Sequence, residues 1–237
     1  METSQKHPIM VFGPHRSGTN FVQKILELNY PVEQIGTGRA DGDRTWKHHS
    51  YSNRLADILD KEYSFAIVCA RDPIKWLNGI VKFNANLWKT CPVISKDNSI
   101  YNWEYKNLVE YIKDHPEWED FKMDIRLCIK HWNDWYFSWF YQTRFTNYTF
   151  IHYHDMLIPE KRDKVLGMLE IKYGLERTSD TLSIPGEVEH SRAWNDMKTK
   201  EELDISLTSN LKHEWLEYAF ENFDPEIVEK IEASRMI

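Results

Sequence analysis

Short runs of apolar residues, each ended by a turn or a charged residue, mark three candidate strands along this chain. They are residues 8–12 (PIMVF), 64–70 (SFAIVCA) and 148–154 (YTFIHYH). Apolar runs of this length are typical of strands that are buried on both faces of a parallel sheet. Apolar residues at helical spacing lie between and after these runs. The helical candidates are the stripe Phe21, Val22, Ile25 and Leu26 and the segments 52–62, 73–83, 159–174, 209–223 and 225–236.

Strands that alternate with helices predict an α/β fold, in three layers with a central parallel β-sheet. Residues 84–144 break the alternation and form an insertion that we expect to be mainly helical and rich in aromatic residues, with helices at 105–115 and 124–143. Within it Trp132, Trp135 and Trp139 are spaced i, i+3, i+7, which favours core packing over a wall that stacks on substrate. The length of 237 residues predicts a single domain over residues 1–237.

Composition narrows the classes of function. A hydrophobic content of 41% suffices for a core, and the net charge of -7 argues against a general nucleic-acid-binding protein. Cys69, Cys91 and Cys128 lack metal-ligand spacing and predict reduced thiols. The first residues, METSQKHP, do not read as a secretory signal, and no apolar run approaches the ~20 residues of a membrane span. We therefore expect a soluble, cytoplasmic protein that binds neither membrane nor nucleic acid.

The first candidate strand runs into a loop, VFGPHRSGTN (11–20), that is close to an ATP-binding phosphate loop. Gly13 and Gly18 have the required spacing, but Thr19 and Asn20 occupy the positions of the lysine and of the magnesium-binding hydroxyl. A strand, a glycine turn and a helix start place backbone N–H groups around one anion. Hydroxyl donors and the cation of Arg16 add to that site, so the sequence predicts a phosphate-type ligand held without magnesium.

The segment RSGTNF resembles the 5′-phosphosulfate loop of sulfotransferases that use 3′-phosphoadenosine 5′-phosphosulfate, whose pattern is Lys or Arg, then Ser-Gly-Thr-Thr and often Trp. The resemblance implies a P-loop nucleoside-triphosphate-hydrolase-like fold and assigns the 5′-phosphosulfate to the loop. Phe21 stands where the family has an aromatic contact to adenine, and a core-facing helix residue is the other interpretation. The residues expected to bind the 5′-phosphosulfate are Arg16, Ser17, Gly18, Thr19 and Asn20.

A second stretch, VCARDPIKWLNG, resembles the motif that binds the 3′-phosphate of this donor. Arg71 matches the family arginine at the end of a strand, where ligands of parallel α/β sheets bind and where its fork can grip a phosphate. The family serine eight residues later is Gly79 here, and Asn78 is the candidate to replace it. Taken alone, Arg-Asp-Pro is an ordinary helix start.

A third stretch, TWKHHS, is similar to the Lys-Thr-His segment of cytosolic members, whose lysine helps the leaving group and whose histidine acts as base. Lys47 and His49 match that spacing. Residues 45–49 are a possible strand, in which Lys47 and His49 would share one face while His48 points away. We expect His49 to be the base, with His48 as the alternative. The remaining candidate for the base is a carboxylate in the preceding loop, which is Glu33, Asp41 or Asp43.

Two weaker features lie later in the chain. His154 stands in place of the glutamate in the Tyr-Glu-Asp-Leu strand end of the superfamily, and with His152 and Asp155 it could suggest a metal, although we expect none. Residues 186–200 lie where the family has a late basic loop over the 3′-phosphate. Arg192 or Lys198 could serve there, but a solvated charged loop is the simpler interpretation.

The sequence therefore predicts a metal-independent sulfotransferase that moves a sulfuryl group in line to a hydroxyl or amine with the help of a base. The acceptor is a small molecule or a carbohydrate whose identity stays open, as does the oligomeric state. Two alternatives remain: a nucleoside or small-molecule kinase with a divergent phosphate loop, and a non-catalytic nucleotide-binding module. Magnesium dependence separates the sulfotransferase from the kinase, and turnover separates both enzymes from the binding module.

Overall fold

The structure is a computed structural model in which residues 6–34, 47–48, 50–62, 65–86, 92–94, 100–102, 125–185 and 213–235 are described. The chain divides into two compact units. The first contains Met1–Arg71, Trp135–Met197 and Glu226–Ile237, and the second contains Asp72–Asp134 and Lys198–Pro225. No helix in the described ranges is both long and apolar enough to cross a membrane.

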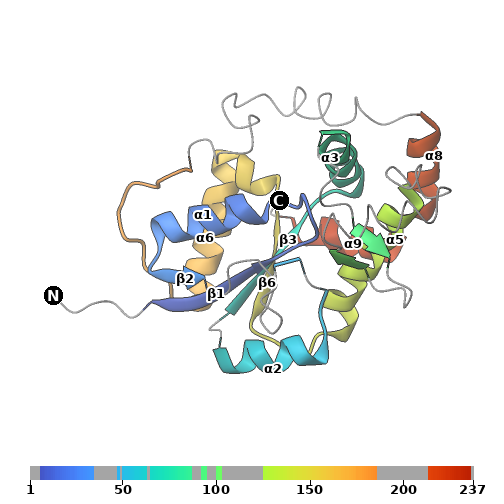
Figure 1. Cartoon of the computed structure of the whole chain (residues 1–237). Helices are drawn as coiled ribbons and strands as arrows, with labels where there is room; N and C mark the ends of the chain where they lie inside the picture. The colour runs from blue at the N-terminus through green and yellow to red at the C-terminus, as the bar shows by residue number, and fades with distance from the viewer. Residues whose placement is uncertain are drawn as a thin grey trace. The chain divides into compact units, whose positions relative to one another are not determined.

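A parallel four-stranded sheet forms the centre of the first unit (Figure 1). Its strands, in spatial order, are β2 (Val32–Gln34), β1 (His7–Phe12), β3 (Phe65–Ala70) and β6 (Tyr148–His152). The three apolar runs of the sequence are therefore strands, and all six residues of β3 are buried, as expected for a sheet covered on both faces. The expected third strand is shorter than its apolar run, because residues 153 and 154 already belong to a turn.

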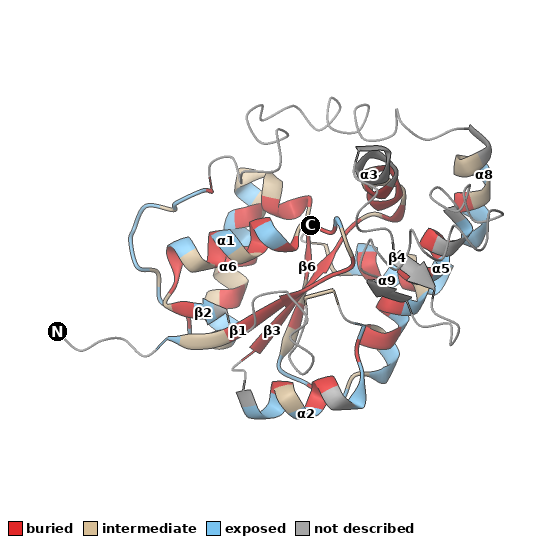
Figure 2. Cartoon of the chain, viewed as in Figure 1, coloured by how far each residue is buried: buried red, intermediate tan, exposed pale blue. Residues whose placement is uncertain are grey.

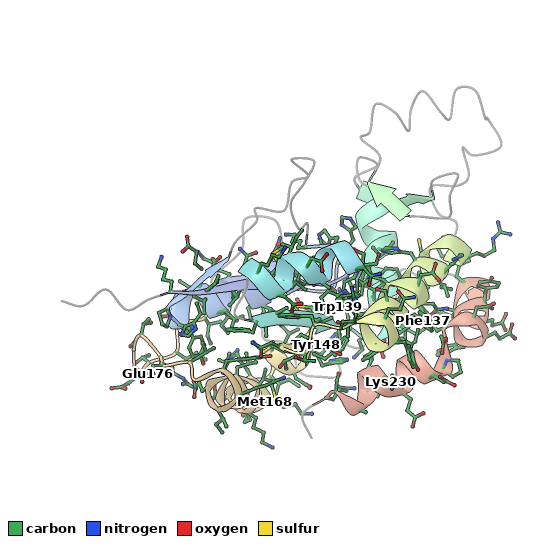
Figure 3. All side chains as sticks on the ribbon, turned by 90° about the horizontal axis from the view of Figure 1, so that it is seen from below. Phe137, Trp139, Tyr148, Met168, Glu176 and Lys230 are labelled. Carbon is green, nitrogen blue, oxygen red and sulfur yellow. The ribbon has the colours of Figure 1, made fainter. Side chains whose placement is uncertain are left out.

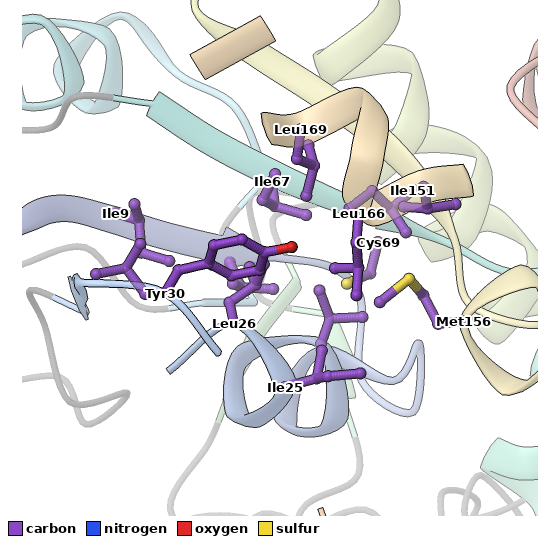
Figure 4. Packing of buried hydrophobic residues seen from close by; sticks show 14 of the residues in the cluster. Ile9, Ile25, Leu26, Tyr30, Ile67, Cys69, Ile151, Met156, Leu166 and Leu169 are labelled. Carbon is purple, nitrogen blue, oxygen red and sulfur yellow. The ribbon is translucent and has the colours of Figure 1, made fainter. Parts of the chain in front are cut away.

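One face of the sheet is covered by α1 (Thr19–Asn29) and α6 (Pro159–Tyr173). Odd-numbered strand residues such as Val11, Ile67 and Ile151 face these helices, because side chains alternate between the two faces of a strand. They join one hydrophobic cluster with α1 residues such as Ile25 and α6 residues such as Leu166 (Figure 4). This packing fixes the start of α1, and with it the loop that precedes the helix.

The opposite face is covered by α2 (Asn53–Glu62) (Figure 1) and by aromatic side chains of a π-helix, η3 (Ser138–Gln142). Trp139 lies 5.0 Å from Phe12 and 5.3 Å from Tyr51 between ring centroids, and it also neighbours Tyr148 (Figure 3). Lys230 of α9 (Pro225–Ala233) lies over the Tyr141 ring, 5.1 Å from its centroid. Helices therefore cover both faces of the central sheet, which confirms the predicted three-layer α/β class.

The second unit contains α3 (Pro73–Asn86), the antiparallel pair β4 (Pro92–Ile94) and β5 (Ile100–Asn102), most of α5 (Ile125–Phe137), and α8 (His213–Asn222). Trp132 of α5 is fully buried and meets Phe223 edge to face at 4.9 Å. The Trp132, Trp135 and Trp139 side chains are at most 1% exposed, so core packing is confirmed for all three. Figure 2 colours by burial the residues whose burial is described, with the buried positions in red.

Candidate functional site: a phosphate-type loop at the sheet edge

The candidate site lies at the carboxyl edge of the central sheet, where the topology changes direction. From β1 the chain passes to β2 on one side, whereas β3 pairs on the other side of β1. Such a reversal opens a crevice at the carboxyl ends of the two central strands, where α/β proteins bind ligands. Gly13 follows β1 and Arg71 follows β3 at this edge.

The loop between β1 and α1 has two residues in the left-handed conformation. Arg16 has φ 66° and Gly18 has φ 93°, and Ser17 N donates to Pro14 O at 3.1 Å. Left-handed residues of this kind turn successive N–H groups into a concave nest that suits an anion. For the non-glycine Arg16 this conformation costs about 1–2 kcal/mol, so the remaining structure must hold the loop in shape.

Both glycines of the loop are required by close contacts. A Cβ at Gly18 would lie 2.0 Å from the Tyr153 ring, and a Cβ at Gly13 would lie 2.1 Å from Ser17 Oγ. Each glycine is therefore required for its own reason, because a side chain at either position would collide with a different neighbour. Tyr153, on the turn after β6, packs directly against the loop.

Within the described part of the chain, no side chain competes with an anion for the amino end of α1. Gly18 is the N-cap, no side chain caps the helix, and its first turn holds no acidic residue. Ser17 is fully buried, and its Oγ has no hydrogen-bond partner among the described residues. A buried hydroxyl beside an uncapped helix start fits an anionic ligand, because both would donate to its oxygens.

Lys47 and His48 are bound to the loop through Gly13. Gly13 N donates to Lys47 O at 2.9 Å, and Gly13 O accepts from Nδ1 of His48 at 2.7 Å. Trp135 Nε1 also donates to His48 O at 3.0 Å. The strand expected around these residues is wrong for Lys47 and His48, which form a turn. Their peptide groups pair with Gly13 and Trp135 rather than with a strand ladder.

The side chain of Lys47 reaches the first turn of α1, where its Nζ donates to Asn20 Oδ1. Burial lowers the pKa of Lys47, since removal from water disfavours its charged form. Burial also lowers the pKa of Arg16. The loop lacks the usual lysine, and Lys47 supplies an ammonium group from another segment.

His48 is held in a defined orientation. Because the Gly13 carbonyl can only accept, Nδ1 of His48 must carry the proton in this hydrogen bond, and in the neutral ring Nε2 is then the basic nitrogen. The His48 ring stacks on His15, with centroids 3.9 Å apart and planes 28° apart. His49, expected to be the base, lies outside the described residues.

Arg71 follows the end of β3, and its side chain lies against the loop. It is 8% exposed, its Nη1 donates to Arg16 O at 2.5 Å, and its guanidinium lies 5.3 Å from the centroid of the Tyr153 ring. Burial raises the pKa of Tyr153 to about 12, against the opposing effect of Arg71 and Arg16, so this phenol stays protonated at neutral pH. Arg71, Tyr153 and the loop thus form one contiguous group.

Other predicted residues lie elsewhere. Phe21 is 3% exposed and belongs to the core cluster, with its ring edge-on to Tyr153. Asn78 lies in the second unit, is 1% exposed, and its Oδ1 has no hydrogen bond to the described residues. Glu33 is exposed in β2. Four further candidates lie outside the described part of the chain: Asp41, Asp43, Arg192 and Lys198.

The histidines at the end of β6 and in the turn that follows belong to no group of three potential metal ligands within the described ranges. His152, His154 and Asp155 are buried, and Asp155 Oδ1 lies 3.8 Å from Lys161 Nζ and 4.0 Å from Arg235 Nε. Asp155 therefore faces cationic side chains.

Two residues of the site, His15 and Tyr153, were not anticipated from the sequence. Tyr153 could have been found by its position, since it is the first residue after β6 at the carboxyl edge of a parallel sheet. His15 gave no such signal, because a single histidine in a loop is common and its stacking partner lies 33 positions away.

Comparisons with known proteins give little independent information. No model of a known protein family matches the chain, and no curated protein sequence is significantly similar to it. A similar solved structure is the crystal structure of mouse sulfotransferase SULT7A1 complexed with PAP, with a TM-score of 0.42 and 12% identity over 96% of this chain and 82% of that chain. A likeness of this size carries no argument about function, so the function has to be inferred from the residues of the site.

Proposed function

We propose that this protein is a sulfotransferase that moves a sulfuryl group from 3′-phosphoadenosine 5′-phosphosulfate to a hydroxyl or amine. The observation that carries the proposal is the hydrogen-bonded attachment of Lys47 and His48 to Gly13. It brings a cation and a histidine to a phosphate-type loop whose own lysine is missing. A module that only binds a nucleotide has no need of this pair.

In this proposal the loop holds the 5′-phosphosulfate. Backbone N–H groups at the start of α1, the Ser17 and Thr19 hydroxyls, and the Asn20 amide donate to its oxygens. Arg16 adds a permanent positive charge. The 3′-phosphate is assigned to Arg71, with Asn78 and Arg192 as supporting candidates. Phe21 belongs to the core cluster, so the adenine contact that the family resemblance implies for it is not part of the proposal.

For the chemical step, His49 or His48 takes the proton of the acceptor as its oxygen or nitrogen attacks sulfur. A new bond to sulfur forms while the bond between sulfur and the 5′-phosphate oxygen breaks in line. Lys47 and Arg16 neutralise the charge that develops on that departing oxygen. These side chains take the part that magnesium plays in kinases. A kinase loop would need a lysine and a magnesium-binding hydroxyl, whose positions are occupied here by Thr19 and Asn20.

The hydrogen bond from His48 Nδ1 to Gly13 O favours His48 as the base, because it holds the ring on the loop and leaves Nε2 as the basic nitrogen. His49 stays in the proposal through the Lys-x-His spacing of the family. The acceptor is proposed to be a small molecule or a carbohydrate, without involvement of nucleic acid or membrane, and the protein to act in the cytoplasm.

The test is a screen of acceptors with sulfur-labelled donor in excess chelator, using unmutated protein, His48→Asn and His49→Asn. Turnover should survive the chelator, and loss of the base should lower it by ~10²-fold or more while donor affinity is kept. Strict dependence on added magnesium would replace this proposal by the kinase, and donor binding without any turnover would replace it by the binding module.

A further inference from the structure

The stacked pair of His15 and His48 gives His15 a part in the site that no sequence motif assigns. His15 belongs to the loop itself, between Pro14 and the left-handed Arg16. Its ring centroid lies 3.9 Å from that of His48, with the planes 28° apart. Rings at this separation are stacked face to face, and both side chains are only partly exposed, so the stack removes one face of each ring from water.

Two contacts are needed to fix an imidazole ring. The hydrogen bond from His48 Nδ1 to Gly13 O holds one edge of the ring, but when this single bond breaks, χ1 and χ2 of His48 can change and the proton is no longer held on Nδ1. A second ring against its face opposes this change. The hydrogen bond and the stack together therefore determine the direction in which Nε2 of His48 points.

Both contacts come from the loop that would hold the anion. Gly13 and His15 lie three and one positions before Arg16, so a shift of the loop moves the His48 ring with it. We propose that His15 is a positioning residue that holds His48 Nε2 in register with the anion in the loop. This inference rests on the proposed function, and it selects His48 rather than His49 as the proton acceptor.

His15 would support a step in which one proton and one sulfuryl group are transferred. The acceptor O–H proton passes to His48 Nε2, the acceptor oxygen forms its bond to sulfur, and the bond from sulfur to the 5′-phosphate oxygen breaks with its electron pair left on that oxygen. An error of about 1 Å in the base position costs on the order of 10²-fold in rate. A contact that fixes a single ring rotation can therefore control turnover without touching the substrate.

The neighbours of the pair indicate that His15 acts through its ring face rather than its charge. Arg16 follows His15 in the chain, and Lys47 precedes His48, so the surroundings are already cationic. His15→Phe should therefore keep the stack, whereas His15→Ala should lose it. This difference distinguishes orientation from acid–base chemistry by His15 itself.

The experiment uses the full chain labelled with nitrogen-15 in its imidazoles. Long-range proton–nitrogen correlation spectra report the tautomer of each histidine, and His48→Asn identifies the His48 signals. The inference predicts a single Nδ1–H tautomer for His48 in the unmutated protein and in His15→Phe, and mixed tautomers in His15→Ala. His7→Ala, at the amino end of β1, is the matched control and should leave the His48 signals unchanged.

The same variants are assayed with labelled donor and 4-nitrophenol as the probe acceptor. His15→Ala should lower kcat about ten- to hundredfold and leave the KM for donor within about twofold, and His15→Phe should restore kcat to within about threefold. An unchanged His48 tautomer and kcat in His15→Ala would overturn the inference, as would failure of His15→Phe to restore them. If the unmutated protein shows the tautomer pattern but transfers no sulfuryl group to any acceptor, the proposed function fails while the orienting contact stands.

Discussion

Arg71 Nη1 donates a hydrogen bond to the carbonyl oxygen of Arg16 at 2.5 Å, and this contact joins the end of β3 to the loop that follows β1. It holds the carbonyl of the left-handed residue, the most strained point of the loop. Arg71 therefore shapes the loop, and the 3′-phosphate role proposed for it is an addition to this structural one.

Replacement of Arg71 by alanine should weaken the binding of two nucleotides to different degrees. Adenosine 3′,5′-bisphosphate should lose ~10- to 150-fold in affinity, as expected for a charge-assisted contact. Adenosine 5′-monophosphate should lose about two- to tenfold, because the loop is no longer held by the hydrogen bond to Arg16. Calorimetric titration of both ligands measures the two losses. An unchanged affinity for the monophosphate would show that the contact to Arg16 does not maintain the loop.

Gly18→Ala should abolish anion binding and destabilise the fold. The new methyl group would lie 2.0 Å from the Tyr153 ring, and φ 93° is strained for alanine. Gly174→Ala is the matched control, since Gly174 also has positive φ, 64°, but nothing lies within 4 Å of its Cβ position. The control should cost only the backbone strain, about 1–2 kcal/mol of unfolding free energy. Denaturant unfolding of both variants gives the comparison, and equal losses would mean that the contact with Tyr153 is unimportant.

Anion affinity should fall at alkaline pH because of Lys47. Burial lowers the pKa of Lys47 below its ordinary 10.5, and only the protonated ammonium attracts the anion. Affinity should therefore be full below the lowered pKa and decline as the pH rises through it. The ligand-free protein should gain stability over the same window, because the unfolded chain binds the proton more tightly there.

Lys47→Arg tests this origin of the pH dependence. Arginine keeps its charge, so the decline in affinity should move to higher pH, whereas Lys24→Arg, at a half-exposed lysine of α1, should change nothing. Titrations of adenosine 3′,5′-bisphosphate from pH 7 to 10 follow the effect. A decline that is the same in Lys47→Arg would assign it to another group.

Much of the first unit could be predicted from the sequence for simple reasons. β1, β3 and β6 are buried on both faces, so their apolar runs stand out, and the α1 stripe has clear helical spacing. β2 was not anticipated, because three residues are too few for a periodic pattern. The paired strands β4 and β5 were missed for the same reason.

The site was predictable only where one short segment contains the signal. The loop from Gly13 to Asn20 is contiguous, and its glycines and Arg16 could be identified from spacing. The contacts that join separate segments could not, since Lys47 reaches Asn20 and His48 reaches His15 through a turn that the sequence suggested would be a strand. The turn depends on hydrogen bonds of Lys47 and His48 with Gly13, which lies more than thirty positions earlier in the chain, so a local sequence pattern does not reveal it.

We propose that the loop and Arg71 bind a nucleotide with phosphates at both its 3′ and 5′ positions, without magnesium. Calorimetric titration tests this binding mode. Adenosine 3′,5′-bisphosphate and adenosine 5′-monophosphate are each titrated in excess chelator, and ATP with magnesium is titrated in a separate run. The two adenosine ligands differ only in the 3′ group, so we expect at least a ~10-fold preference for the bisphosphate. Equal affinity for the two, or tighter binding of magnesium ATP, would contradict it.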